Sequence, residues 1–240
     1  MFNERLNDSG LLMPVREDPG LSKISPSLVR IYDSEFPLGS GFILEEDNLF
    51  LVTAAHVIWG GRSDRKRILF ASGEDIEIGR EDVIFVPKKD VALVPLNELV
   101  SKGSLVALRR SELLRTLHQM GSQIENEGSL TIAAGFPYSY IEHHRLNEIA
   151  LYSVGRALEL WVPPGSDRES NPSLLVTSNR VESGMSGGPL LDQENAVVGV
   201  ISNKPGFFGT SFKGIFYSDD FRVHVQYNYL YAAILPEIIH

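Results

Sequence analysis

The sequence predicts an all-β fold built of two β-barrel halves. Short runs of apolar and β-branched residues recur along the chain between turn residues, a pattern typical of barrels. The pattern breaks between residues 104 and 130 and then resumes, which indicates one link between two β halves. The chain has 240 residues, of which 43% are hydrophobic and 22% charged, enough for one large or two small domains.

Residues 1–25 lack clear periodicity and carry two prolines and two glycines. We expect them to form an extended N-terminal arm, which either packs across the body or is disordered. Residues 26–122 are expected to form the first β-barrel. Its predicted strands are residues 28–32, 39–44, 49–53, 67–71, 75–78, 83–86 and 91–96.

Residues 123–240 are expected to form the second β-barrel. Before it, Ser111 is a suitable cap for a short helix that ends at Gly121, and the polar residues 123–128 suit the link. The predicted strands of the second half are residues 130–136, 148–158, 173–177, 190–192, 196–202 and 212–217.

Composition argues against several classes of protein. The chain contains no cysteine, so it forms no disulfide, thiolate zinc site or cysteine nucleophile and needs no oxidising compartment. Its formal net charge of −9 argues against a nucleic-acid partner, which needs a basic face. The polar start carries no apolar signal segment, and no apolar run approaches the length that spans a bilayer. We therefore expect a cytoplasmic protein with no membrane partner.

The segment from Gly184 to Gly188, Gly-Met-Ser-Gly-Gly, has the pattern of a serine nucleophile at Ser186. Gly184 lets the backbone turn sharply, so the N–H groups of Gly184 and Ser186 can converge as an oxyanion hole. A plain glycine-rich turn between strands explains this motif alone equally well. An α/β-hydrolase nucleophile elbow is disfavoured, because β-type runs rather than a helix follow Ser186.

A serine nucleophile needs a base and a group that orients the base. His56 follows a short apolar strand and two alanines, and Asp90 stands at the head of an apolar run. Each alone is more readily explained as structural, since an aspartate before a strand commonly closes a turn. With Ser186 they occur in the order His, Asp, Ser, each in the local context that a catalytic triad requires.

Four motifs carry a resemblance to a known family. They are GSGFIL (39–44), LVTAAHV (51–57), DVALVPL (90–96) and GMSGGPLLD (184–192). On these motifs the chain resembles the chymotrypsin/trypsin-like serine peptidases. It is most similar to the cysteine-free bacterial branch called the trypsin-like peptidase domain, to which the Htr-type proteases are related.

The resemblance implies a fold and catalytic roles. It implies two antiparallel six-stranded β-barrels, a C-terminal helix within residues 226–239, and an active site where the two halves meet. It also implies that His56 is the general base, that Asp90 orients it, and that Ser186 is the nucleophile.

The resemblance further implies residues that bind substrate. Arg180, six residues before the nucleophile, falls at the base of the primary pocket, where a guanidinium would favour an acidic side chain unless Glu182 neutralises it. Ser202, Asn203 and Lys204 fall where the substrate backbone pairs as an added strand.

The sequence therefore predicts a serine endopeptidase that cleaves protein or peptide substrates through an acyl-enzyme. No cofactor or metal is expected, since adjacent His143 and His144 would point to opposite faces of a strand. The alternative is a latent or non-catalytic module of the same fold, which binds a peptide or partner protein and becomes active only after an activating partner orders it. The intact His56, Asp90 and Ser186 argue against a dead enzyme.

Overall fold

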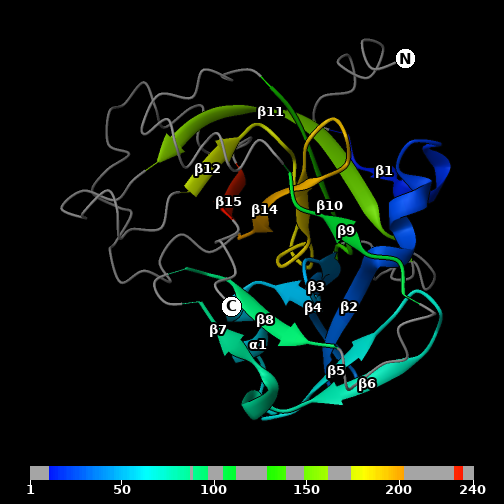
Figure 1. Cartoon of the computed structure of the whole chain (residues 1–240), viewed down its shortest axis with the longest axis vertical. Helices are drawn as coiled ribbons and strands as arrows, with labels where there is room; N and C mark the ends of the chain where they lie inside the picture. Colours follow the sequence, from blue (N-terminus) through cyan, green and yellow to red (C-terminus); the bar gives the residue numbers. More distant parts are fainter. Residues whose placement is uncertain are drawn as a thin grey trace.

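The structure is a computed structural model that describes residues 11–86, 89–96, 105–111, 129–138, 149–161, 174–202 and 230–234. These residues form two mainly antiparallel β-sheets with few and short helices. In Figure 1 most of the first sheet, blue to green, lies in the lower half of the view, and most of the second, green to red with the blue β1, lies in the upper half. The predicted all-β class is confirmed over the described part of the chain.

The first sheet contains the strands expected from the first half of the sequence. They are β2 (Leu28–Asp33), β3 (Phe36–Glu45), β4 (Leu49–Thr53), β5 (Lys66–Leu69), β6 (Asp75–Ile78), β7 (Ile84–Phe85), β8 (Ala92–Pro95) and β9 (Leu108–Arg109). The strand order is β6-β5-β2-β3-β4-β8-β7, and β9 pairs with β3 in parallel. The two-residue β9 was not predicted, because so short a strand has no readable pattern.

The second sheet contains β10 (Leu130–Gly135), β11 (Leu151–Trp161), β12 (Leu174–Thr177), β13 (Pro189–Leu191), β14 (Val197–Ile201), β15 (Leu230–Ile234) and β1 (Met13–Pro14). Its pairings run β11-β10-β13-β14-β15-β12 and return from β12 to β11, while β1 adds to β11. The first sheet has eight strands: seven lie on a path that does not close among the described residues, and β9 lies off that path beside β3. Two six-stranded barrels are therefore not confirmed.

The C-terminal helix is corrected where the structure describes that region. Leu230–Ile234 is the strand β15, paired to β12 on one side and to β14 on the other. Backbone pairing on both edges outweighs the helix propensity of its leucine and alanines. The rest of residues 226–239 lies outside the described residues, as do 112–128, which hold most of the expected helix and the link, and the expected strand 212–217.

Helices are short in the described part of the chain. They are the α-helix α1 (Ala55–Trp59) and the 3₁₀ turns η2 (Val15–Glu17), η3 (Ser22–Ser27) and η4 (Arg80–Asp82). None of these described helices has the length and apolar content that crossing a membrane requires.

The segment 11–27 lies against both sheets. Its strand β1 pairs with β11, and η3 leads directly into β2 of the first sheet. Val15 and Leu21 are fully buried, and the Asp18 carboxylate accepts a hydrogen bond from the Tyr152 hydroxyl at 3.0 Å. The buried side chains of the two sheets belong to one continuous core.

Candidate active site

His56 lies in α1, directly after the buried strand β4. The residues between them, Ala54 and Ala55, are small and buried. The loop that carries Ser186 approaches this segment closely: a Cβ on Gly187 would lie 3.0 Å from the backbone nitrogen of Ala54. The His56 side chain is 10% exposed.

Asp90 lies in the turn between β7 and β8 and is fully buried. Because β8 pairs antiparallel with β4, with Thr53 opposite Ala92, the residues after β4 lie beside those before β8. One Asp90 oxygen lies 2.6 Å from His56 Nδ1, and the other accepts the His56 backbone N–H at 2.9 Å. The carboxylate thus fixes both the ring and the backbone of the histidine.

The ionisation of Asp90 determines which ring nitrogen of His56 is free to accept a proton. Burial by itself would raise the pKa of Asp90, but hydrogen bonds from His56 and Ser202 and the charge of His56 bring that pKa below its ordinary value. An ionised carboxylate only accepts hydrogen bonds, so Nδ1 of His56 carries a proton and Nε2 of the neutral ring is an acceptor. Nε2 can therefore serve as a base.

Ser202 contacts Asp90, which the sequence analysis missed. Its buried hydroxyl donates to Asp90 Oδ2 at 2.5 Å across 112 residues of sequence. No local pattern signals a contact over that separation. Asn203 and Lys204 lie outside the described residues, so pairing of this segment with a substrate backbone stays a prediction.

We expect Ser202→Ala to make the fold more sensitive to acid. The Ser202 hydroxyl lowers the pKa of Asp90, so its loss raises that pKa. A carboxyl whose pKa is depressed in the folded state stabilises the protein fully at a pH above its unfolded-state pKa, near ~3.9 for aspartate. This stabilisation is lost as the pH falls through the folded-state pKa. The variant should therefore lose it at a higher pH than the wild type.

Unfolding followed by tryptophan fluorescence from pH 7 down to about pH 2 tests this expectation. At neutral pH the variant should lose about 1.5–3 kcal/mol of stability, the usual contribution of a hydrogen bond to a charged group. Ser153→Ala is the control, since its buried hydroxyl donates to the neutral Arg180 carbonyl at 2.6 Å. Equal acid midpoints in wild type and Ser202→Ala would contradict the role given to the Ser202 hydroxyl.

Ser186 lies in the loop between β12 and β13, and this loop rests on the first sheet. The Ser40 backbone N–H donates to the Ser186 carbonyl at 2.8 Å. Gly187 has a φ of +88°, and a Cβ there would overlap the Ser40 carbonyl oxygen and the Thr53 hydroxyl. Only glycine at this position lets the loop that carries the proposed nucleophile (residues 178–188, called the nucleophile loop) reach the strands that lead to His56.

Between Gly184 and Gly188, two N–H groups are available to a ligand. The N–H groups of Met185, Gly187 and Gly188 donate to backbone carbonyls at 3.0, 2.8 and 3.0 Å. In the part of the chain that the structure describes, the N–H groups of Gly184 and Ser186 have no acceptor. These are the two groups that the sequence analysis placed in an oxyanion hole.

The directions of these two N–H groups follow from their carbonyl partners. In a planar trans peptide the C=O and N–H point in opposite directions. The Ser183 carbonyl accepts from Tyr138 N–H at 2.6 Å, so the Gly184 N–H points away from Tyr138. The Met185 carbonyl accepts from Gly188 N–H, so the Ser186 N–H points away from Gly188.

Arg180 already has a carboxylate partner. Its guanidinium is about half exposed and lies 2.9 Å from Glu182, the residue expected to neutralise it. This pairing weakens the argument for an acidic substrate side chain in the primary pocket. The place of Arg180 in that pocket stays a prediction.

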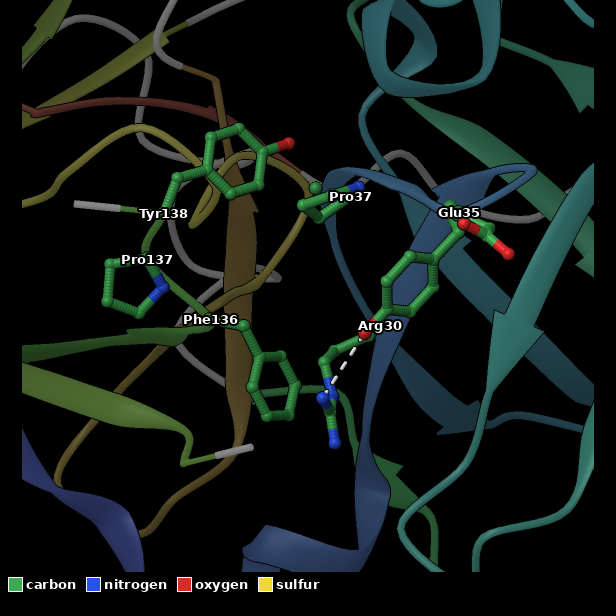
Figure 2. Close-up of a pocket in the computed structure, with 8 residues that line it drawn as sticks. Arg30, Glu35, Pro37, Phe136, Pro137 and Tyr138 are labelled. Carbon is green, nitrogen blue, oxygen red and sulfur yellow. Dashed lines mark hydrogen bonds between the residues drawn. The ribbon is translucent and has the colours of Figure 1, made fainter. Parts of the chain in front are cut away.

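A cavity of about 90 Å³ lies between the first sheet and residues 136–138, which follow β10. Figure 2 shows Phe136 and Tyr138 on one side and Pro37 on the other, with the Arg30 guanidinium next to the Phe136 ring. The Arg30 guanidinium lies 5.1 Å from the centre of that ring. Burial raises the pKa of the Tyr138 phenol, which keeps it neutral. The sequence analysis did not identify this cavity.

Comparison with known proteins identifies the family of the chain. A model of the trypsin-like peptidase domain matches residues 39–200. The chain is 28% identical over 181 residues to a probable periplasmic serine endoprotease DegP-like of Pseudomonas fluorescens, covering 73% of this chain and 32% of that protein. It is 28% identical over 192 residues to serine protease HTRA1 of Xenopus laevis, covering 75% and 36%. The chain thus spans about a third of the length of these curated relatives.

Solved structures show a similar fold. The HtrA-type protease AlgW with tripeptide superposes with a TM-score of 0.57 at 16% identity, covering 90% of this chain and 58% of that chain. The active form of the Rv3671c protease from M. tuberculosis gives a TM-score of 0.58 at 20% identity, covering 92% and 82%.

Proposed function

The chain belongs to the trypsin-like peptidase domain family, and from this premise we propose that it is a serine endopeptidase with His56, Asp90 and Ser186 as its triad. The observation that carries the proposal is the double contact of Asp90 with the ring and backbone of His56. Two N–H groups without acceptors among the described residues support it on the side of the nucleophile. Similarity to Htr-type serine proteases supports the same class of reaction.

The proposed reaction has two steps. Nε2 of His56 takes the hydroxyl proton as Ser186 Oγ bonds to the scissile carbonyl carbon, and the electron pair moves to the carbonyl oxygen. The Gly184 and Ser186 N–H groups stabilise that oxyanion. Collapse breaks the C–N bond, His56 protonates the leaving amine, and the acyl group stays on Ser186. His56 then deprotonates a water, whose oxygen bonds to the acyl carbon. The ester bond to Ser186 Oγ breaks, the acid leaves, and His56 returns the proton to Oγ.

The substrate of the proposed enzyme is a protein or peptide. The AlgW structure contains a tripeptide, and the DegP-like relatives are named endoproteases. In this proposal the two sheets correspond to the two barrels of the family fold, with residues 26–122 and 123–240 as its halves. A cytoplasmic location stays a prediction, and the DegP-like relatives are named as periplasmic.

We expect a fluorophosphonate probe to label Ser186 in the purified full chain. The probe reacts only with an activated serine, and a general base contributes about 10²–10⁴ in rate. His56→Ala should therefore label at least about a hundredfold more slowly. Mass spectrometry of the labelled peptide identifies the modified residue.

Two results would contradict parts of the proposal. Labelling at another serine would contradict the assignment of Ser186 as the nucleophile. No labelling of a folded protein would favour the latent module, and the same probe would then be applied in the presence of an activating partner.

A further inference from the structure

We propose that Ser40 is a positioning residue for the oxyanion hole. Its hydroxyl, which belongs to the first sheet, holds the nucleophile loop of the second sheet so that the Gly184 and Ser186 N–H groups face the substrate carbonyl. This inference rests on the proposed function and names a residue that acts on the reaction without touching the substrate.

Ser40 uses its side chain and its backbone to bind the nucleophile loop. It lies in β3 and is fully buried. Its hydroxyl donates to the Gly184 carbonyl at 2.7 Å and accepts the Phe136 N–H at 2.8 Å. Its backbone N–H donates to the Ser186 carbonyl at 2.8 Å. One serine thus binds the backbone at both proposed oxyanion residues.

The orientation of Gly184 depends on such bonds because glycine has no side chain to restrict it. Gly184 has a φ of +100° and stands between two peptide groups. The preceding carbonyl, of Ser183, is held by Tyr138 N–H, and its own carbonyl is held by the Ser40 hydroxyl. Together the two bonds fix the φ and ψ of Gly184. The Ser40 bond holds the peptide between Gly184 and Met185, which joins the two peptides that carry the proposed oxyanion N–H groups. Without this bond that peptide keeps only the Met185 N–H bond to the Glu182 carbonyl, so the two oxyanion N–H groups are less firmly fixed relative to each other.

The Ser40 hydroxyl also links the loop to the wall of the cavity in Figure 2. Its acceptor contact is with Phe136, and Tyr138 of the same wall holds Ser183. Packing around the hydroxyl is tight: a Cβ on Gly135 would lie 2.9 Å from Ser40 Oγ and 2.9 Å from Met185 Cα. Because the site is buried, the substitution Ser40→Ala removes the hydroxyl and leaves the Gly184 carbonyl and the Phe136 N–H without their hydrogen-bond partner.

The test compares Ser40→Ala with Ser111→Ala in the full chain. Ser111 is a matched control: it is also buried, and its hydroxyl also reaches a distant segment, the Asp192 carboxylate, without contacting the nucleophile loop's oxyanion residues. Hydrolysis of p-nitrophenyl acetate is followed before the steady state. The burst amplitude counts competent active sites, and the burst rate measures acylation of Ser186.

We expect Ser40→Ala to acylate about 10–100-fold more slowly, somewhat less than the loss of a direct oxyanion donor. Its burst amplitude should match that of the wild type. Ser111→Ala should keep both quantities. A purely structural role for Ser40 would instead lower the amplitude and leave the rate per active site unchanged, which would overturn the proposal. Ser40→Cys keeps a weak donor and should recover part of the rate.

A second measurement decides the proposal without using catalysis. Amide hydrogen exchange of residues 183–188, read by mass spectrometry, reports how firmly the loop is held. It should be at least about tenfold faster in Ser40→Ala and unchanged in Ser111→Ala. A wild type that shows neither a burst nor fluorophosphonate labelling would refute the proposed function alone. Unchanged exchange in Ser40→Ala would refute the positioning role.

Discussion

Ser186→Ala and His56→Ala should each lower kcat by on the order of 10⁶, and the double variant should lose no more than either single variant. The reason is that the serine hydroxyl and the imidazole base act as one unit: without the base the hydroxyl is a weak nucleophile, and without the hydroxyl the base has no proton to take. The variants should still cleave the substrate about 10³–10⁴-fold faster than the uncatalysed reaction in water, because the oxyanion hole and substrate binding remain.

Steady-state cleavage of a labelled protein such as casein measures these losses, with Ser111→Ala prepared in parallel as a control for activity lost during preparation. Circular dichroism confirms that each variant is folded. If the double variant fell below the singles by a further large factor, His56 and Ser186 would be acting independently. A Ser186→Ala variant that kept more than about 1% of the activity would place the nucleophile elsewhere.

Gly187→Ala should destabilise the protein far more than Gly73→Ala. Both glycines have a φ of +88°, so both substitutions carry the same backbone strain of about 1–2 kcal/mol. At Gly73 a Cβ meets nothing within 4 Å, whereas at Gly187 it overlaps the Ser40 carbonyl and the Thr53 hydroxyl. Overpacking typically adds about 1–3 kcal/mol, and here the obstruction includes backbone, so we expect at least the upper end.

Urea unfolding of the two variants measures the difference directly, because their strain in φ cancels. The acylation burst of any folded Gly187→Ala protein should also fall, since the loop can only escape the clash by moving away from β3 and β4. Equal free energies of unfolding for the two variants would show that the loop is not pressed against the first sheet.

Local patterns predicted most of the strands and three site candidates. Alternating or continuous apolar runs bounded by turn residues coincide with β2 to β8 and with β10 to β14. His56 and Asp90 were found because each stands at the end of such a run, and Ser186 because glycines surround it. The sequence could therefore predict that the imidazole and the carboxylate belong together, a contact that the structure places at 2.6 Å.

Contacts between distant segments could not be predicted from one sequence. Ser202 and Asp90 are 112 residues apart, and Ser40 and Gly184 are 144 apart. Serine is common in strands and turns, so neither serine carries a local signal of its partner. The strand β15 was missed for the same reason: its residues suit a helix, and only the edges of β12 and β14 make it a strand.

The bond between Ser40 and the nucleophile loop has a consequence for a chain that is still being made. Residues 28–95, which contain the strands β2 to β8 together with His56 and Asp90, are synthesised before residue 186. In the proposed enzyme the hydrolytic centre is therefore complete only after the later half docks on β3, and a chain without that half lacks the proposed nucleophile.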